Sequence, residues 1–198
     1  MVIGVTGGVG SGKTTFSREL AKQGASWVDA DAMAKNLLDE DPRLPQALRK
    51  EFGPDMFDAS GRLQRRRLAR QIFSDPLKVL ALNRIMWPPL LERIRETLSA
   101  IRERDPLAVA VLDMAVLFES GADVLTDQTV LVCASRKKRM EWVSKKRGWS
   151  RGEFRLRMQN QFTDREKCAL ADVVVRNQGS VQDLRRKARD FFRPFVLK

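Results

Sequence analysis

Histidine is absent from this chain of 198 residues. Its absence excludes an imidazole general base and the usual zinc sites, so any general base must be a carboxylate or another group. Cysteine is scarce as well, because only Cys133 and Cys168 occur. With two cysteines a disulfide framework is not expected, and reduced thiols in the cytoplasm are the simpler interpretation.

Long apolar runs are also missing from the sequence, and we expect no secretory leader. No run approaches the roughly 20 residues that span a bilayer, and no basic segment precedes the first predicted strand. We therefore expect a cytoplasmic protein without a membrane partner. The formal net charge of +12 favours a polyanionic partner, either a nucleic acid or a phosphate-rich small molecule with its nucleotide.

A glycine-rich segment near the N-terminus carries the strongest functional signal. Residues 7–14 read GGVGSGKT, which fits the pattern G-x-x-x-x-G-K-[ST]. A strand predicted at residues 1–6 precedes it and a helix predicted at residues 15–21 follows it, the context in which such a loop binds phosphates. Lys13 is expected to reach the β- and γ-phosphates, and the Thr14 hydroxyl to bind Mg²⁺. The predicted nucleotide-binding residues are Gly8, Val9, Gly10, Ser11, Gly12, Lys13, Thr14 and Thr15.

Two aspartates, Asp29 and Asp31, stand at the end of a second strand, predicted at residues 26–29. In a parallel sheet this strand end lies along the same edge as the phosphate loop. A carboxylate there can orient an attacking hydroxyl or accept its proton. The alternative is that both aspartates only cap a helix predicted at residues 32–38. The neighbouring phosphate loop favours the functional interpretation.

From residue 41 to about residue 105 the pattern is wholly helical. Helices are predicted at residues 44–52, 63–73, 76–86 and 89–104, and such a block suits a lobe that holds the second substrate. It contains a basic cluster, whose members are Arg62, Arg65, Arg66, Arg67 and Arg70. Because arginine presents a planar pair of donors to phosphate, one or two of these residues are expected to face the substrate and the others the solvent. The cluster lacks the interleaved aromatic residues that would favour nucleic acid.

Three more strands and a basic helical segment complete the pattern. The strands are predicted at residues 108–113, 129–133 and 172–175, and a closing helix at residues 180–192. The first of these strands ends in Asp113, in the form of a Walker B strand whose aspartate helps to hold Mg²⁺. Two basic helices joined at residues 148–150 suit a lid that closes over the nucleotide.

These stretches together resemble the dephospho-coenzyme A kinases along nearly the whole chain. Besides the phosphate loop, the resemblance is carried by Asp-Ala-Asp at residues 29–31, by Asp113 with Leu-Phe-Glu at residues 117–119, by Gly-Trp-Ser at residues 148–150 and by Ala-Asp-Val-Val at residues 171–174. The phosphate loop alone would indicate only a P-loop protein. The resemblance implies ATP-dependent phosphorylation of the ribose 3′-hydroxyl of dephospho-CoA, the last step of CoA synthesis.

The resemblance also implies roles for single residues. Asp31 would be the catalytic base. Lys13, from the phosphate loop, is the second predicted catalytic residue, and the two motifs predict Thr14 and Asp113 as the metal ligands. The substrate cleft would contain Thr6, Asp29, Arg65, Asn83 and Glu119. The nucleotide would also contact Arg147 of the lid, and Asn177 and Gly179 would lie by its adenine.

The chain departs from the family pattern at four positions. Trp87 replaces a usual histidine, Ala115 a usual proline and Trp142 a usual lid arginine. Arg176 stands where an acid or a small polar residue is common. None of these changes removes the phosphate loop or Asp31, so we expect an active kinase.

The predicted fold is a single α/β domain over residues 1–198, a P-loop NTPase three-layer sandwich with a mostly parallel five-stranded sheet. Its core comprises residues 1–40, 106–135 and 166–198, with a helical acceptor lobe at about residues 41–105 and a lid at about residues 136–165. The expected cofactors are ATP and Mg²⁺, and the expected partner is a small molecule, dephospho-CoA. The alternatives are a P-loop kinase for a nucleoside or nucleoside monophosphate and, with less support, a nucleic-acid-stimulated NTPase. The sequence does not indicate an oligomeric state.

Overall fold

The computed structural model describes residues 1–72 and 75–196. The chain divides into two compact units, one formed by Met1–Asp31 with Ile94–Lys198 and the other by Ala32–Arg93. The second unit therefore begins and ends earlier than the helical lobe expected at about residues 41–105. The difference arises because helix α2 (Ala30–Glu40) lies mostly in the second unit, while the last part of helix α5 (Pro76–Arg104) belongs to the first.

The first unit is built on a parallel sheet. Its described residues form five strands in the order β2-β3-β1-β4-β5, and every neighbouring pair is parallel. The strands are β1 (Val2–Thr6), β2 (Ser26–Asp29), β3 (Ala110–Asp113), β4 (Gln128–Cys133) and β5 (Val173–Arg176). The central strands are nearly continuous apolar runs, which is typical of parallel strands covered on both faces. The predicted five-stranded sheet is confirmed.

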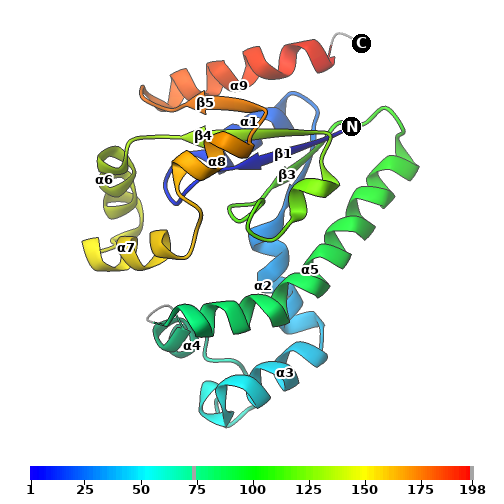
Figure 1. Ribbon diagram of the computed structural model, residues 1–198. Helices are drawn as coiled ribbons and strands as arrows, with labels where there is room; N and C mark the ends of the chain where they lie inside the picture. Colours follow the sequence, from blue (N-terminus) through cyan, green and yellow to red (C-terminus); the bar gives the residue numbers. More distant parts are fainter. Residues whose placement is uncertain (73–74, 197–198) are drawn as a thin grey trace. The chain divides into compact units, whose positions relative to one another are not determined.

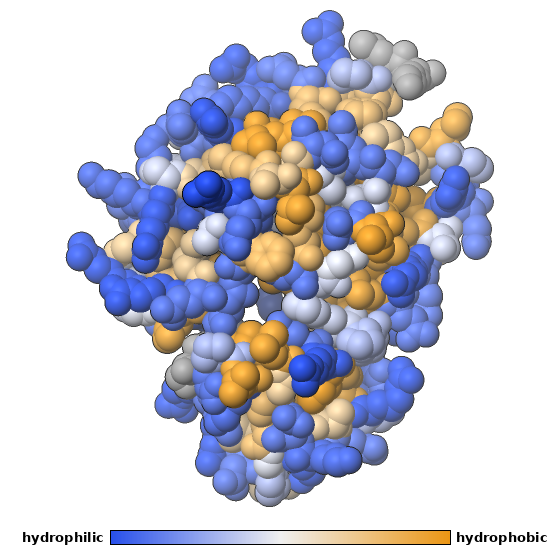
Figure 2. Space-filling view, in the orientation of Figure 1, coloured by the Kyte–Doolittle hydropathy of each residue, from blue (hydrophilic) through white to orange (hydrophobic). Residues whose placement is uncertain are grey.

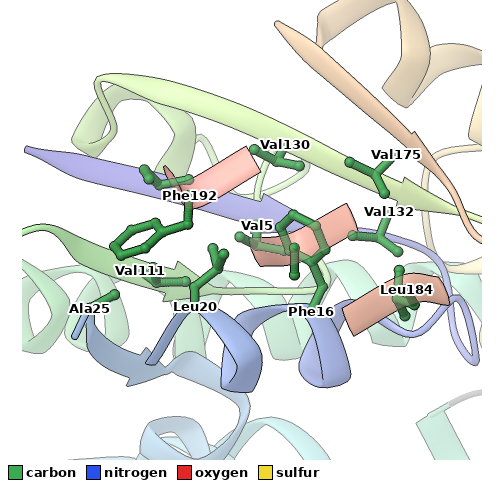
Figure 3. Close-up of a cluster of buried hydrophobic side chains, with 12 residues drawn as sticks. Val5, Phe16, Leu20, Ala25, Val111, Val130, Val132, Val175, Leu184 and Phe192 are labelled. Carbon is green, nitrogen blue, oxygen red and sulfur yellow. The ribbon is translucent and has the colours of Figure 1, made fainter. Parts of the chain in front are cut away.

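Helices α1 (Lys13–Lys22) and α9 (Val181–Val196) pack together on one face of the sheet (Figure 1). Phe16 and Leu20 of α1 and Leu184 and Phe192 of α9 are all buried against the valines of the strands (Figure 3). This spacing of apolar residues places one face of each helix on the sheet. Burial of these side chains fixes α1, and hence the loop that precedes it.

The other face of the sheet is covered by the 3-10 helix η2 (Ala122–Leu125) and by helix α8 (Asp164–Leu170) (Figure 1). Gly4 of β1 faces this side, where an added Cβ would come within 2.9 Å of Leu117. Helices on both faces give the predicted three-layer sandwich, which is confirmed. Helix α8 was not predicted, although Thr163 and Glu166 form a capping box at its start.

The predicted lid segment consists of helix α6 (Arg136–Arg147) and helix α7 (Arg151–Gln159), joined at Gly148 with φ of 67°. Glycine adopts this left-handed conformation without the steric penalty of a Cβ atom, so it commonly ends a helix. Ser150 and Glu153 form a capping box that starts α7. Hydrophilic side chains project from the region of these two helices in Figure 2, as expected for their many basic residues.

The second unit is helical, with its own small core. Besides most of α2 and α5 it contains α3 (Arg43–Phe52), the 3-10 helix η1 (Pro54–Met56) and α4 (Arg65–Ile72). Its buried residues include Leu48, Phe52, Met56, Leu68 and Ile72. The helix predicted at residues 63–73 begins later, at Arg65, and its predicted end at residue 73 lies outside the described residues.

The prediction of two helices at residues 76–86 and 89–104 is wrong. Helix α5 is continuous and contains Pro88 and Pro89. Each proline removes one backbone donor and its ring crowds the carbonyl four residues earlier, yet the helix continues through both. Leu90 follows the prolines directly and Ile94 lies one turn further on, and both are buried, so packing stabilises the helix beyond them. No helix within residues 1–72 and 75–196 is long and apolar enough to cross a membrane.

Candidate active site

The glycine-rich loop connects β1 to α1, as its spacing predicts. Gly10 and Gly12 have φ values of 77° and 101°, which favour glycine, and the Ser11 amide donates to the Gly8 carbonyl at 3.0 Å. The side-chain amide of Asn177 donates to the Ser11 carbonyl at 2.9 Å. A Cβ on Gly12 would lie only 2.6 Å from that same amide nitrogen. The loop is therefore shaped by glycine conformations and by a contact from the far end of the chain.

Lys13, the first residue of α1, joins two of the predicted carboxylates. Its Nζ lies 2.7 Å from Oδ1 of Asp113 and 3.2 Å from Oδ2 of Asp31. Burial alone would lower the pKa of Lys13, but the charges and hydrogen bonds of Asp113 and Asp31 outweigh it, and the pKa is raised. Lys13 therefore stays positively charged at neutral pH, at the point where the phosphate loop meets α1.

The two carboxylates differ sharply in exposure. Asp113 is fully buried at the end of β3, whereas the side chain of Asp31, in the first turn of α2, is 55% exposed. Burial raises the pKa of Asp113, and the charge of Lys13 opposes that shift. Asp29 pairs in register with Asp113 across β2 and β3. The ends of β2 and β3 and the first turn of α2 thus bring three acidic residues to the edge of the sheet that carries the loop.

One carboxylate oxygen of Asp113 accepts no hydrogen bond from the described residues. Its Oδ2 is buried and has no hydrogen-bond partner among the described residues. Within that part of the chain no three acidic, cysteine or histidine side chains form a complete metal cage. Mg²⁺ usually takes only one or two protein carboxylates and fills its other positions with phosphate oxygens and waters. The chemistry of Thr14 and Asp113 fits such an incomplete set.

A second polar cluster surrounds Lys167 of α8. Its Nζ is fully buried and lies 2.5 Å from the Ala115 carbonyl, 2.9 Å from Oε1 of Glu119 and 3.5 Å from Oγ1 of Thr6. Burial lowers the pKa of Lys167, and the charge of Glu119 opposes this shift. Thr6 and Glu119, both predicted for the substrate cleft, are therefore brought together by a lysine to which the sequence assigned no role.

One carboxylate oxygen of Glu119 accepts no hydrogen bond from the described residues. Oε1 accepts from both Lys167 and the Phe162 amide, at 2.9 and 2.8 Å, whereas Oε2 is buried without a partner among the described residues. Ala115, which replaces a usual proline, takes part through its carbonyl alone. The contact to Ala115 therefore depends only on the backbone and does not require the usual side chain.

Arg139 of α6 is a further residue that sequence reasoning missed. Only 3% of its side chain is exposed, and one guanidinium nitrogen pairs with Asp164 at 3.1 Å. The guanidinium passes so close to Gly8 that a Cβ there would lie 2.0 Å from Nη1. Burial lowers the pKa of Arg139, and Asp164 opposes the shift. The basic segment offered no periodic signal that distinguishes this arginine from its exposed neighbours.

Other predicted nucleotide contacts have different surroundings. Arg147 is exposed, and its guanidinium carbon lies 5.1 Å from the centre of the Trp149 ring. Asn177 uses its side-chain amide on the loop, and a Cβ on Gly179 would clash with Asp183 at 2.4 Å. Trp142, at the position of a usual lid arginine, is half-buried.

Arg65 and Asn83 belong to the second unit. The Arg65 guanidinium donates to the Lys35 carbonyl at 2.9 Å and to Asp39 at 2.8 Å, and it is 42% exposed. Asn83 lies on α5 and is half-buried. Both remain predicted acceptor contacts.

Comparison with known proteins identifies the family. The family model described as dephospho-CoA kinase matches residues 1–183. The chain belongs to the dephospho-CoA kinase family. The dephospho-CoA kinase of Corynebacterium diphtheriae is 36% identical over 197 residues, covering 100% of this chain and 98% of that protein.

Solved structures show the same fold. TT1252 from Thermus thermophilus is 32% identical with a TM-score of 0.79, and the match covers 98% of this chain and 97% of that one. The dephospho-CoA kinase from Campylobacter jejuni, 16% identical with a TM-score of 0.64 over 100% and 98% of the two chains, shares the fold. The family resemblance and the fold class predicted from the sequence are both confirmed.

Proposed function

We propose that this protein phosphorylates the ribose 3′-hydroxyl of dephospho-CoA with ATP and so completes CoA synthesis. Membership of the dephospho-CoA kinase family supports the reaction and its small-molecule acceptor. The observation that carries the chemistry is the cluster in which Lys13 joins Asp31 and Asp113 at the end of the phosphate loop. A kinase needs a cation for the phosphates and a carboxylate for the acceptor hydroxyl, and this cluster supplies both.

ATP would be held by residues 8–15 of the loop and α1. Backbone amides of a glycine-rich loop and the N-terminus of a helix attract phosphate oxygens. Lys13 would exchange its two carboxylates for the β- and γ-phosphates, because a polyphosphate presents more negative charge than an aspartate pair. Arg147, Asn177 and Gly179 remain proposed nucleotide contacts, the last two near the adenine.

Mg²⁺ would be held by the Thr14 hydroxyl and by Asp113. Bound there, the ion would neutralise charge that develops on the transferred phosphoryl group. The buried, unpartnered Oδ2 of Asp113 supports this assignment. Lys13 occupies the other oxygen of the same carboxylate, so its release to the phosphates would leave Asp113 available to the ion.

Asp31 would orient the 3′-hydroxyl and accept its proton as the new bond forms. The exposed carboxylate is accessible to an acceptor, whereas Asp113 is buried. The chain has no histidine, so an imidazole base is excluded, and the exposed Asp31 carboxylate is a suitable group for this step. The proposed acceptor contacts are Thr6, Asp29, Arg65, Asn83 and Glu119, where the unpartnered Oε2 of Glu119 supports a role as hydrogen-bond acceptor.

An acceptor panel with purified protein and ATP tests the proposal. Dephospho-CoA should be phosphorylated far faster than cytidine, uridine or their monophosphates, and the product should be CoA by mass spectrometry. ATP turnover that responds to RNA or DNA but not to dephospho-CoA would instead favour a nucleic-acid-stimulated NTPase. The cytoplasmic location expected from the sequence stays a prediction.

A further inference from the structure

Among the basic residues of α6 and α7, Arg139 alone combines deep burial with contact to the phosphate loop. Arg136, Lys137 and Arg147 are exposed. Lys138 donates to the Gln178 carbonyl, and the guanidinium carbon of Arg157 lies 4.0 Å from the centre of the Trp149 ring. These neighbouring basic side chains therefore lie in solvent, against a backbone carbonyl or against an aromatic ring, and not against the phosphate loop.

The guanidinium of Arg139 is incompletely paired where it lies. One nitrogen, Nη2, pairs with Oδ2 of Asp164 at 3.1 Å. Nη1 and Nε are buried and have no hydrogen-bond partner among the residues that the structure describes. Arginine stays charged at all ordinary pH values, so two of its donor nitrogens are held out of water without an acceptor among the described residues. Such groups are costly to bury, which indicates that an acceptor is supplied by a ligand.

The unpaired donor Nη1 faces the phosphate loop. A Cβ built on Gly8 would lie 2.0 Å from Nη1 and 3.4 Å from Oδ1 of Asp164. A side chain at position 8 would displace the guanidinium from this place. Gly8 is the second residue of the pattern whose amides surround a triphosphate. A charged donor that rests on this backbone is suitably placed for an oxygen of the terminal phosphate.

We propose that Arg139 donates through Nη1 to the γ-phosphate of ATP, while Asp164 holds the other end of the guanidinium in position. This inference rests on the proposed kinase function and adds a residue that the sequence did not assign. Arg139 would oppose the charge that develops on the γ-phosphoryl group, as a lid arginine does in phosphoryl transfer. Asp164 would be a positioning residue, acting only through Arg139.

Nucleotide binding measured without acceptor tests the inference. In calorimetric titrations, Arg139→Gln should weaken ATP binding by about tenfold or more, the usual size for loss of a charge-assisted hydrogen bond. ADP binding should change by less than about twofold, since ADP lacks the γ-phosphate. Arg139→Lys should recover part of the ATP affinity. Lys137→Gln removes the same charge from an exposed position of α6 and should leave both affinities unchanged.

A double variant separates a phosphate contact from a structural role. Arg139→Gln alone leaves Asp164 without its partner, so it can disturb the lid indirectly. In Arg139→Gln with Asp164→Asn two neutral amides replace the ion pair and can bond to each other. ATP binding should remain weak in this variant if Arg139 contacts the γ-phosphate. Recovery of ATP binding in the double variant, or equal losses for ATP and ADP in the single one, would overturn the inference.

The same titrations distinguish failure of the inference from failure of the proposed function. If the unaltered protein binds ATP but does not phosphorylate dephospho-CoA, the acceptor assignment is wrong and the ATP-to-ADP comparison still decides the role of Arg139. If it phosphorylates dephospho-CoA, kcat of Arg139→Gln should fall by about 10²-fold or more, and an unchanged kcat would also count against the inference.

Discussion

Lys13 and Lys167 are both buried, and each lies within 3 Å of a buried carboxylate oxygen, at 2.7 Å for Asp113 and 2.9 Å for Glu119. Their pKa values nevertheless shift in opposite directions. Lys13 has a second carboxylate, Asp31, and the two charges overcome the effect of burial, so its pKa is raised. Lys167 pairs directly with one carboxylate, Glu119, and its other acceptors are the neutral Ala115 carbonyl and Thr6 hydroxyl. The charges of Asp164 and Lys13 act on it in opposite directions, so burial prevails and the pKa of Lys167 is lowered.

This difference separates a lysine that can change partners from one that is fixed. Both partners of Lys13 are side-chain carboxylates at the mouth of an anion-binding loop, and one of them is exposed. A phosphate can therefore replace them. Lys167 instead bridges the Ala115 backbone carbonyl, Thr6 of β1 and Glu119. We expect substitution of Lys13 to affect turnover and substitution of Lys167 to affect stability first.

The largest effect is expected at Lys13. Lys13→Ala should lower kcat/KM by about 10³-fold or more, because it removes a cation that stabilises the transferred phosphoryl group. Steady-state ADP release with dephospho-CoA measures the loss, and circular dichroism checks the fold. Lys22→Ala, at the exposed end of the same helix, is the matched control and should keep normal turnover. Near-normal turnover of folded Lys13→Ala would refute the phosphate-loop assignment.

Lys167→Met should lower the free energy of unfolding by about 3 kcal/mol or more, since it leaves the buried Glu119 carboxylate without its counter-charge. Urea unfolding monitored by tryptophan fluorescence measures the change. Adding Glu119→Gln should restore much of the stability, because the remaining amide is neutral. Loss of turnover in Lys167→Met without any loss of stability would place this lysine in the chemistry and remove the contrast with Lys13.

Asp31→Asn should lower kcat by at least about 10²-fold, the usual contribution of a positioned general base. ATP should still bind in a calorimetric titration, because the phosphate loop is unchanged. Asp29→Asn is the matched comparison and should cost less. If Asp31→Asn keeps more than about a tenth of the parent kcat, the base must be sought at Asp29 or Asp113.

The contributions of the two lysines to the free energy of unfolding should change differently at alkaline pH, and this effect is the smallest of those predicted. A lysine whose folded pKa is lowered destabilises the folded state at neutral pH, and that cost is relieved as pH rises toward the unfolded value of 10.5. The stability of the parent relative to Lys167→Met should therefore increase between the lowered pKa and pH 10.5, by at most about 1.4 kcal/mol per pH unit.

For Lys13 the sign is reversed. Its pKa is raised, so its stabilising contribution is fully present below pH 10.5 and declines only as pH rises through the folded value. The stability gap between the parent and Lys13→Met should stay constant up to about that pH. Urea unfolding of the three proteins from pH 8 upward measures both trends. Parallel trends for the two variants would show that the pKa shifts do not differ in sign.

The sequence predicted those parts of the fold and site that local spacing determines. The strand, loop and helix around residues 7–14 follow from a short pattern, and the place of Asp113 follows from the rule that parallel strands end at one edge. The meeting of Lys13 with Asp31 and Asp113 could be anticipated in this way. The substrate contacts Arg65 and Asn83 stay predictions.

The parts that the sequence did not predict depend on packing between distant segments. Continuity of α5 through Pro88 and Pro89 is a case in which the local rule was misleading. Burial of Arg139 and Lys167 is set by neighbours far along the chain, and nothing in their own spacing separates them from exposed basic residues. The capping box of Thr163 and Glu166 marks the start of α8 in the sequence. The helix has only seven residues, too few for a periodic pattern of apolar residues to support the prediction.

The bond from Asn177 to Ser11 has a consequence for how the protein is made. It joins residues 166 positions apart, and β1 takes its two neighbours from β3 and β4 in the second half of the chain. During synthesis the phosphate loop is among the first segments to leave the ribosome, yet its supports are among the last. Such distant pairings form slowly, after the local helices. Nascent chains that end before β5 should therefore lack affinity for nucleotide, which makes ATP binding a reporter of completed folding.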